Sequence, residues 1–248
     1  MEAFLDFTIG RQPNDETCGP TCLQAVYRYH GDVLPLEQII HEVPRLESGG
    51  TLAVLLGQHA LKRGYHASLL TYNLKVFDPT WFDLPRAELT AKLKAHRAVE
   101  KSPRVRKATK AYLDFVAAGG DVHMRDLTPD VISTPLQQGI PVLAGLSATY
   151  LYRTAREVGS PMRYDDLHGE PQGHFVVLVG YSVPDRTVLV ADPQRPNPLS
   201  THPIYTVDMD RLVCAIMLGV ITFDANLLVL TREGAAWPPA ATPHAAAP

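Results

Sequence analysis

The spacing of apolar residues changes near the middle of this chain, and the change predicts its architecture. In the first half, apolar residues recur every three or four positions, as they do on one face of a helix. This period predicts helices over 19–30, 36–43 and 52–63, each followed by a glycine or a proline. A longer helical region starts near Pro85, is interrupted at Pro103 and ends at Gly119-Gly120. Residues 65–72 alternate enough to predict a strand.

Short continuous apolar runs replace this period in the second half. Runs of this length, bounded by turn residues, are typical of buried strands. They lie at 140–146, 174–181, 188–191 and 217–223, after a short helix predicted over 128–139. A Pro-Asp-Arg turn joins the second and third runs, which predicts a hairpin. Helices followed by a mostly antiparallel sheet predict an α+β fold with two lobes.

One apolar run, residues 212–230, is long enough to consider as a membrane span. It contains Asp224 and Asn226, and its first half is rich in β-branched residues, so we interpret it as a buried strand followed by a turn. The last stretch, 235–248, is mostly alanine and proline without any period, which predicts a disordered tail. Residues 1–234 are expected to form a single domain.

Charge and cysteine content narrow the possible classes of protein. The 248 residues carry a formal net charge of -3, which gives no reason to expect a nucleic acid or a membrane surface as partner. Three cysteines are too few for a disulfide framework and leave at least one free thiol. The N-terminus lacks the pattern of a secretory signal, so we expect a cytoplasmic, reducing location. Nothing in the sequence indicates an oligomeric state.

Two of the cysteines lie four residues apart at the start of the first predicted helix. Cys18 comes directly before Gly19-Pro20, where unpaired N–H groups and the helix dipole stabilise a thiolate. Cys22 lies one turn further on, on the apolar face, and is expected to be an unreactive packing residue. Cys18 is therefore the candidate nucleophile.

A catalytic thiolate also needs a base, a group that orients the base, and donors for the oxyanion. His174 opens a predicted strand and Asp192 follows its hairpin partner, so both should reach the same end of the sheet. A carboxylate there would fix the tautomer of the imidazole and favour its charged form. Gln12 lies six residues before Cys18, and its amide NH2 could join the Cys18 backbone N–H in an oxyanion hole.

Together these motifs resemble those of the papain-like cysteine peptidases. They are Gln-x5-Cys-Gly-Pro from Gln12, Gly-His-Phe-Val-Val-Leu around His174, and Ala-Asp-Pro around Asp192. The resemblance is greatest to the bacteriocin-processing, double-glycine-leader peptidases and their stand-alone relatives. It implies a helical lobe that carries Cys18, a sheet lobe that carries His174 and Asp192, and an active-site cleft between them. It also implies that Cys18 is the nucleophile, His174 the general base and acid, Asp192 the orienting group and Gln12 the oxyanion donor.

The resemblance covers residues 12–45 and 135–195, and segments 75–126 and 154–172 are expected to be insertions. The implied reaction is hydrolysis of an amide bond in a peptide or protein substrate, with no metal or organic cofactor. Two alternatives remain open. The chain could be an acyltransferase that uses an amine in place of water, or a binding or regulatory module whose thiol does not turn over.

Two charged segments lie within the expected insertions. Residues 92–110 are dense in Lys and Arg and are opposed only by Glu100. We interpret them as a solvated helix face, with an anionic partner site as the alternative. Residues 164–170, Tyr-Asp-Asp-Leu-His-Gly-Glu, come just before His174 and predict a lid or substrate-recognition loop rather than a metal site.

Overall fold

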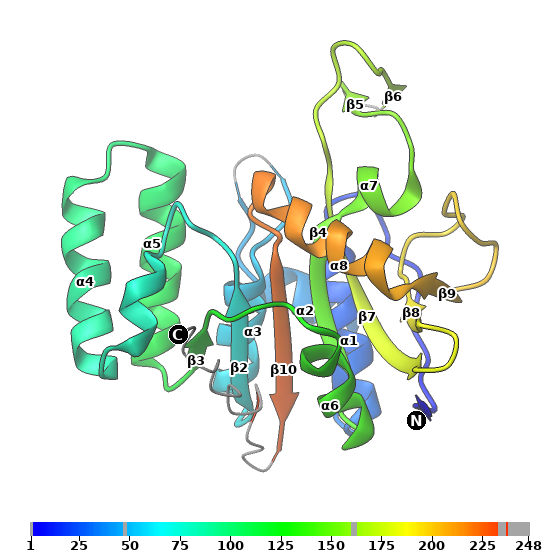
Figure 1. Cartoon of the computed structure of the whole chain (residues 1–248), viewed down its shortest axis with the longest axis horizontal. Helices are drawn as coiled ribbons and strands as arrows, with labels where there is room; N and C mark the ends of the chain where they lie inside the picture. Colours follow the sequence, from blue (N-terminus) through cyan, green and yellow to red (C-terminus); the bar gives the residue numbers. More distant parts are fainter. Residues whose placement is uncertain (1, 47–48, 160–162, 233–236, 238–248) are drawn as a thin grey trace, which may run out of the picture.

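The computed structural model describes residues 2–46, 49–159, 163–232 and 237. In this part of the chain an eight-stranded sheet runs through the centre with helices on both faces (Figure 1). The helices are α1 (Cys18–Tyr29), α2 (Leu36–Glu42), α3 (Ala53–Lys62), α4 (Arg86–Val99), α5 (Pro103–Ala117), α6 (Pro129–Gln137), α7 (Ala148–Tyr152) and α8 (Met209–Leu218), with 3-10 turns η1 (Pro79–Asp83) and η2 (Gly219–Ile221). The strands are β1 (Glu2–Phe4), β2 (His66–Thr71), β3 (Asp121–His123), β4 (Val142–Ser147), β5 (Glu157–Val158), β6 (Arg163–Tyr164), β7 (Gly173–Ser182), β8 (Thr187–Ala191), β9 (Ile204–Asp208) and β10 (Asn226–Thr231).

The sheet order is β3-β2-β10-β4-β7-β8-β9, and β1 pairs with the far end of β7. Of the strand pairs described, β2 with β3 is parallel and the others are antiparallel. The predicted α+β class with a mainly antiparallel sheet is confirmed. The sheet is not confined to the second half of the chain, because β2 and β3 from the first half form one of its edges. The short hairpin of β5 and β6 stands apart at the top of Figure 1.

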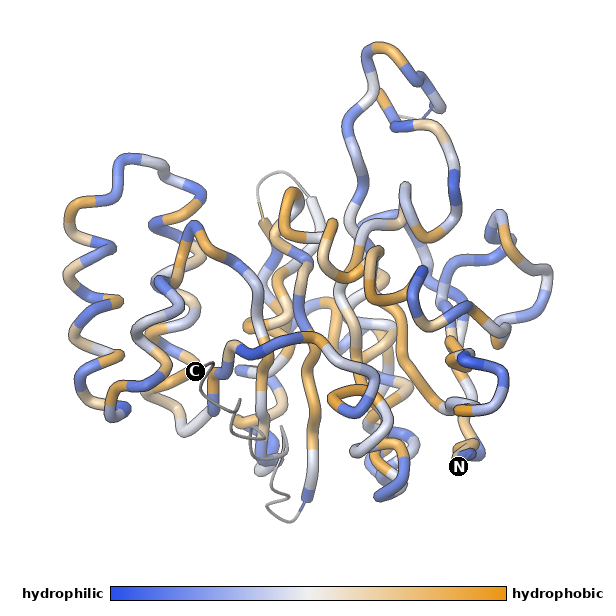
Figure 2. The backbone as a smooth tube through the Cα atoms, in the orientation of Figure 1, coloured by the Kyte–Doolittle hydropathy of each residue, from blue (hydrophilic) through white to orange (hydrophobic). Residues whose placement is uncertain are grey.

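Alternate residues of β7 point into two separate cores. Phe175 and Val177 pack with the core under α1 and α3, whereas Val176 and Leu178 pack with the core under α6 and α8. Both faces of this central strand are therefore buried, which explains its unbroken apolar sequence. In Figure 2 hydrophobic residues, coloured orange, follow the strands in the middle of the molecule.

The strand predicted over 217–223 is wrong, as is the interpretation of 212–230 as a strand followed by a turn. Residues 209–218 form α8, whose buried residues are Met209, Leu212, Ala215 and Ile216, and the strand begins only at Asn226. Asp208 caps the helix, since its side chain accepts a hydrogen bond from the Arg211 backbone N–H over 3.0 Å. Met217 and Leu218 are exposed apolar residues, and they hide the helical period. No helix within the described ranges is long and apolar enough to cross a membrane.

The helical region predicted from Pro85 to Gly119 is confirmed as two helices, α4 and α5, with Pro103 as the first residue of the second. Lys92, Lys94 and Lys110 lie on its exposed side, as expected for a solvated face. In the segment predicted to be a disordered tail, Trp237 is instead buried, and its indole N–H donates to the Val131 carbonyl over 3.1 Å. The other residues of that segment lie outside the described ranges.

Candidate functional site

The first turn of α1 lies close to the start of β7, as the surroundings of Gly19 and a hydrogen bond from Cys22 show. A Cβ atom on Gly19 would come within 3.2 Å of the Phe175 ring, so the close approach depends on a residue without a side chain. One turn further along, the Cys22 thiol donates to the Phe175 carbonyl over 3.2 Å. Burial raises the pKa of Cys22 well above its ordinary value, in agreement with the predicted packing role. These contacts bring Cys18 beside His174.

His174 links the thiol to a buried carboxylate. Its Nε2 lies 2.9 Å from Oδ1 of Asp192, and the Cys18 side chain is close enough to the ring to raise its pKa. Because Asp192 occupies Nε2, Nδ1 is the nitrogen available to Cys18. Burial opposes the charged imidazolium, but the charge of Asp192, its hydrogen bond and the contact with Cys18 together raise the pKa of His174 to about 10. The surroundings therefore favour the protonated ring that an ion pair with a thiolate requires.

Asp192 is fully buried and accepts hydrogen bonds from four groups. His174 and the Gln194 backbone N–H reach Oδ1, both over 2.9 Å. The hydroxyls of Tyr152 in α7 and Tyr205 in β9 each donate to Oδ2 over 2.7 Å. Burial favours the protonated acid, but the charge of His174 and the bonds from these donors outweigh it and hold the pKa of Asp192 below its ordinary value. The four donors and the charge of His174 thus favour the ionised form of this buried carboxylate.

Gln12 is fixed to the same strand end. Its backbone N–H donates to the carbonyl of Pro193, the residue after Asp192, over 2.9 Å. The amide Nε2 donates to the Asn14 carbonyl over 3.0 Å, which leaves one N–H of the amide for another acceptor. The residue is 9% exposed, and its Oε1 is buried without a hydrogen-bond partner among the described residues.

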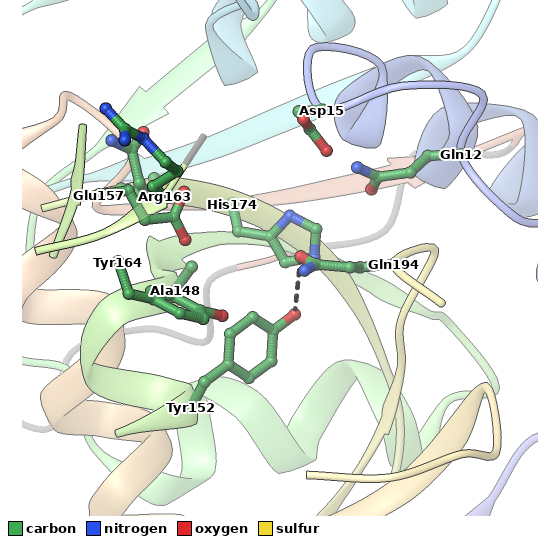
Figure 3. A pocket seen from close by; sticks show the side chains of 11 residues that line it. Gln12, Asp15, Ala148, Tyr152, Glu157, Arg163, Tyr164, His174 and Gln194 are labelled. Carbon is green, nitrogen blue, oxygen red and sulfur yellow. Dashed lines mark hydrogen bonds between the residues drawn. The ribbon is translucent and has the colours of Figure 1, made fainter. Parts of the chain in front are cut away.

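A pocket of about 290 Å³ opens beside His174. Gln12 and Asp15 form one side of it, Tyr152 and Gln194 another, and residues of the β5–β6 hairpin a third. Figure 3 shows these side chains gathered around the His174 ring, with the 3.5 Å contact between Tyr152 and Gln194 dashed. The segment predicted as a recognition loop contributes Tyr164 to this lining. Among the residues described, no group of three His, Cys, Asp or Glu side chains is arranged to hold a metal ion.

Of the four residues singled out from the sequence, Gln12 and His174 line the same pocket, Asp192 is paired with His174, and Cys18 influences His174 electrostatically although it is not part of the pocket lining. The sequence reasoning missed Tyr152 and Tyr205. Each lies next to an apolar run, in α7 and β9, and nothing in its local sequence distinguishes it from an ordinary core tyrosine. Only the sheet order, which places β9 beside β8, could have indicated that Tyr205 reaches Asp192.

Comparison with known proteins identifies the family. A family model described as the Peptidase_C39 like family matches residues 4–210. This chain belongs to that family. It is therefore a cysteine-type peptidase, and the resemblance seen in the sequence is confirmed. The chain matches none of the curated proteins with which it was compared.

Solved structures with similar chains include three peptidases. The first is a C39-like peptidase from Bacillus anthracis, 15% identical, with a TM-score of 0.48 over 95% of this chain and 100% of that one. A double-glycine-motif protease from an AMS/PCAT transporter, in complex with its leader peptide, is 14% identical, with a TM-score of 0.44 over 92% and 93%. The cysteine protease xylellain from Xylella fastidiosa is 17% identical, with a TM-score of 0.45 over 94% and 86%.

Proposed function

We propose that this C39-like peptidase hydrolyses a peptide amide bond with Cys18, His174, Asp192 and Gln12. The observation that carries the proposal is the buried Asp192–His174 pair, joined over 2.9 Å, whose imidazole is influenced by the thiol at the first turn of α1. A packing cysteine needs no such partner, and a buried carboxylate that stabilises an imidazolium is what a thiolate nucleophile requires.

In the first half of the reaction the Cys18 thiolate attacks the carbonyl carbon of the substrate. The free N–H of the Gln12 amide and the Cys18 backbone N–H donate to the oxyanion that forms. His174 then transfers its proton from Nδ1 to the leaving amine, and the C–N bond breaks to leave a thioester on Cys18. Asp192 keeps the His174 ring oriented while the ring loses its positive charge.

In the second half, neutral His174 accepts a proton from water through Nδ1, and the hydroxide formed attacks the thioester. The C–S bond breaks, the peptide acid leaves and the thiolate–imidazolium pair is restored. An amine in place of water would give acyl transfer by the same steps, so product analysis with and without an added amine separates these two reactions.

The test is the rate at which each cysteine reacts with iodoacetamide, followed by mass spectrometry of the digested protein. At pH 6 a free thiol, with a pKa of about 8.5, is almost fully protonated and reacts slowly. We expect Cys18 to react faster than Cys214 at this pH, although Cys214 is exposed and Cys18 is buried. His174→Ala should remove the difference. If Cys18 reacts no faster than the buried Cys22, or if His174→Ala leaves its rate unchanged, the proposed catalytic pair is wrong.

A further inference from the structure

The pocket beside His174 contains two carboxylates without a counter-ion. Asp15, in the turn before α1, and Glu157, in β5, both line it, and within the described residues neither has a cation within 4 Å. The two side chains come from segments more than a hundred residues apart in sequence. Figure 3 shows both carboxylates around the space next to the His174 ring.

The two carboxylates influence one another electrostatically. Partial burial raises the pKa of Glu157, and the negative charge of Asp15 raises it further. Two acids that face the same space repel one another, and a cation between them relieves that repulsion. A bound cation would thus be stabilised by both residues.

Arg163 in β6 also lines the pocket but does not supply that cation. Its side chain is exposed, and no ion pair within the described ranges joins it to Glu157 or Asp15. The charges that shift the pKa of Glu157 are those of Asp15 and His174. The positive charge of His174 is already paired with Asp192, since His174 Nε2 lies 2.9 Å from Asp192 Oδ1.

Gln12 provides a second, independent sign of a missing ligand. Gln12 is 9% exposed and lines the pocket, and its Oε1 is buried without a hydrogen-bond partner in the described part of the chain. A buried acceptor left unpaired destabilises the folded protein. An ammonium or guanidinium group has several N–H donors, so it could hydrogen-bond both carboxylates and, after a rotation of the Gln12 amide that exposes Oε1, this oxygen as well. Tyr164, on the third side, adds an aromatic ring to the lining, and such rings attract the aliphatic part or the charge of a Lys or Arg side chain.

We propose that Asp15, Glu157 and Gln12 form a cation-recognition subsite, which selects peptides with Lys or Arg next to the bond that is cut. This proposal rests on the proposed function and names its substrate class. The volume of about 290 Å³ lies near the lower limit of ligand pockets and suits one long side chain rather than a folded segment. The position of the subsite beside His174 places the selected residue within one or two positions of the scissile bond.

The experiment scans internally quenched peptides that carry Lys, Arg, norleucine or acetyl-lysine at each position around the scissile bond. We expect Lys and Arg to be preferred over the two neutral residues at one position. Glu157→Gln should lower kcat/KM for the Lys peptide about tenfold and change kcat/KM for the norleucine peptide less than twofold. Asp15→Asn should act in the same direction. The matched control is Glu170→Gln, which removes an exposed carboxylate of the same loop that does not line the pocket.

Cleavage of neutral and cationic peptides at equal rates would overturn the subsite while leaving the peptidase intact. So would an equal loss for both peptides in Glu157→Gln, or the same loss in Glu170→Gln. Failure of the proposed function is seen separately, because the reactivity of Cys18 towards iodoacetamide needs no peptide. If Cys18 lacks that reactivity and no peptide is cleaved, both the proposed subsite and the proposed catalytic function are wrong.

Discussion

Replacing Tyr205 with phenylalanine tests whether the fold holds Asp192 as an anion. The Tyr205 hydroxyl is buried and donates to Oδ2 of Asp192 over 2.7 Å. The substitution removes this donor and keeps the ring, and Tyr152 still donates to the same oxygen over 2.7 Å. A hydrogen bond to a charged group contributes about 1.5–3 kcal/mol. We therefore expect Tyr205→Phe to lower the free energy of unfolding by about 2 kcal/mol at pH 7.

Urea unfolding measures this change, and in a chain of this length it corresponds to a melting temperature lower by about 4–8 °C. The control is Tyr29→Phe, because the Tyr29 hydroxyl donates to a neutral acceptor, the Gly139 carbonyl, over 2.8 Å. A neutral hydrogen bond contributes about 1 kcal/mol. The difference between the two substitutions reports the charge of Asp192.

The two substitutions should also differ in their dependence on pH. The pKa of Asp192 is depressed in the folded protein, so its stabilising contribution is present above the unfolded pKa of about 3.9 and is lost as the pH falls through the folded value. Once Asp192 is protonated, Tyr205 donates to a neutral acid and its loss matters less. The cost of Tyr205→Phe should thus shrink as the pH falls from about 3.9 through the depressed folded pKa of Asp192, while that of Tyr29→Phe stays nearly constant. Equal costs at pH 7, or a Tyr205 cost that does not shrink over the pH range in which folded Asp192 becomes protonated, would refute the reasoning.

Two further predictions concern the residues at the start of β7. Because the pKa of His174 is raised to about 10, its contribution to stability is complete below the unfolded value of about 6.5 and is lost as the pH rises through 10. The difference in unfolding free energy between the wild type and His174→Gln should therefore be largest at pH 6 and shrink towards pH 10 in urea titrations, and a difference that does not change with pH would contradict it. Gly173→Ala would make a Cβ atom clash with Oδ2 of Asp224, so we expect it to cost about 2–3 kcal/mol and to slow alkylation of Cys18. Gly10→Ala, which meets nothing within 4 Å, should be close to neutral, and equal effects of the two substitutions would count against the clash.

The sequence predicted the parts of the fold that depend on local pattern. The period of α1 and the apolar run of β7 each follow from which sides of the element are buried, and both lie within two residues of their predicted ends. The candidate site could be predicted for the same reason. Cys18 is marked by the helix start that follows it, and His174 and Asp192 by the ends of two strands in one hairpin.

The rest depends on tertiary contacts that no local pattern encodes. In α8 the exposed Met217 and Leu218 make a helix look like a strand, because apolar residues stand on both of its sides. Tyr152 and Tyr205 belong to the site because the folded chain positions α7 and β9 around Asp192. The repulsion between Asp15 and Glu157 likewise exists only in the folded chain.

The donors around Asp192 connect the folding of the chain with the chemistry of its thiol. A carboxylate with no exposed surface is costly unless it is paired and hydrogen-bonded. Its donors come from α7, β7, β9 and the segment after β8, so all of these must be in place before the charge is stabilised. The raised pKa of His174 depends on that charge. On the proposed mechanism, a chain in which the β7-β8-β9 edge is incomplete would lack the imidazolium partner of Cys18, and the activated thiol would arise only once this edge of the sheet has formed.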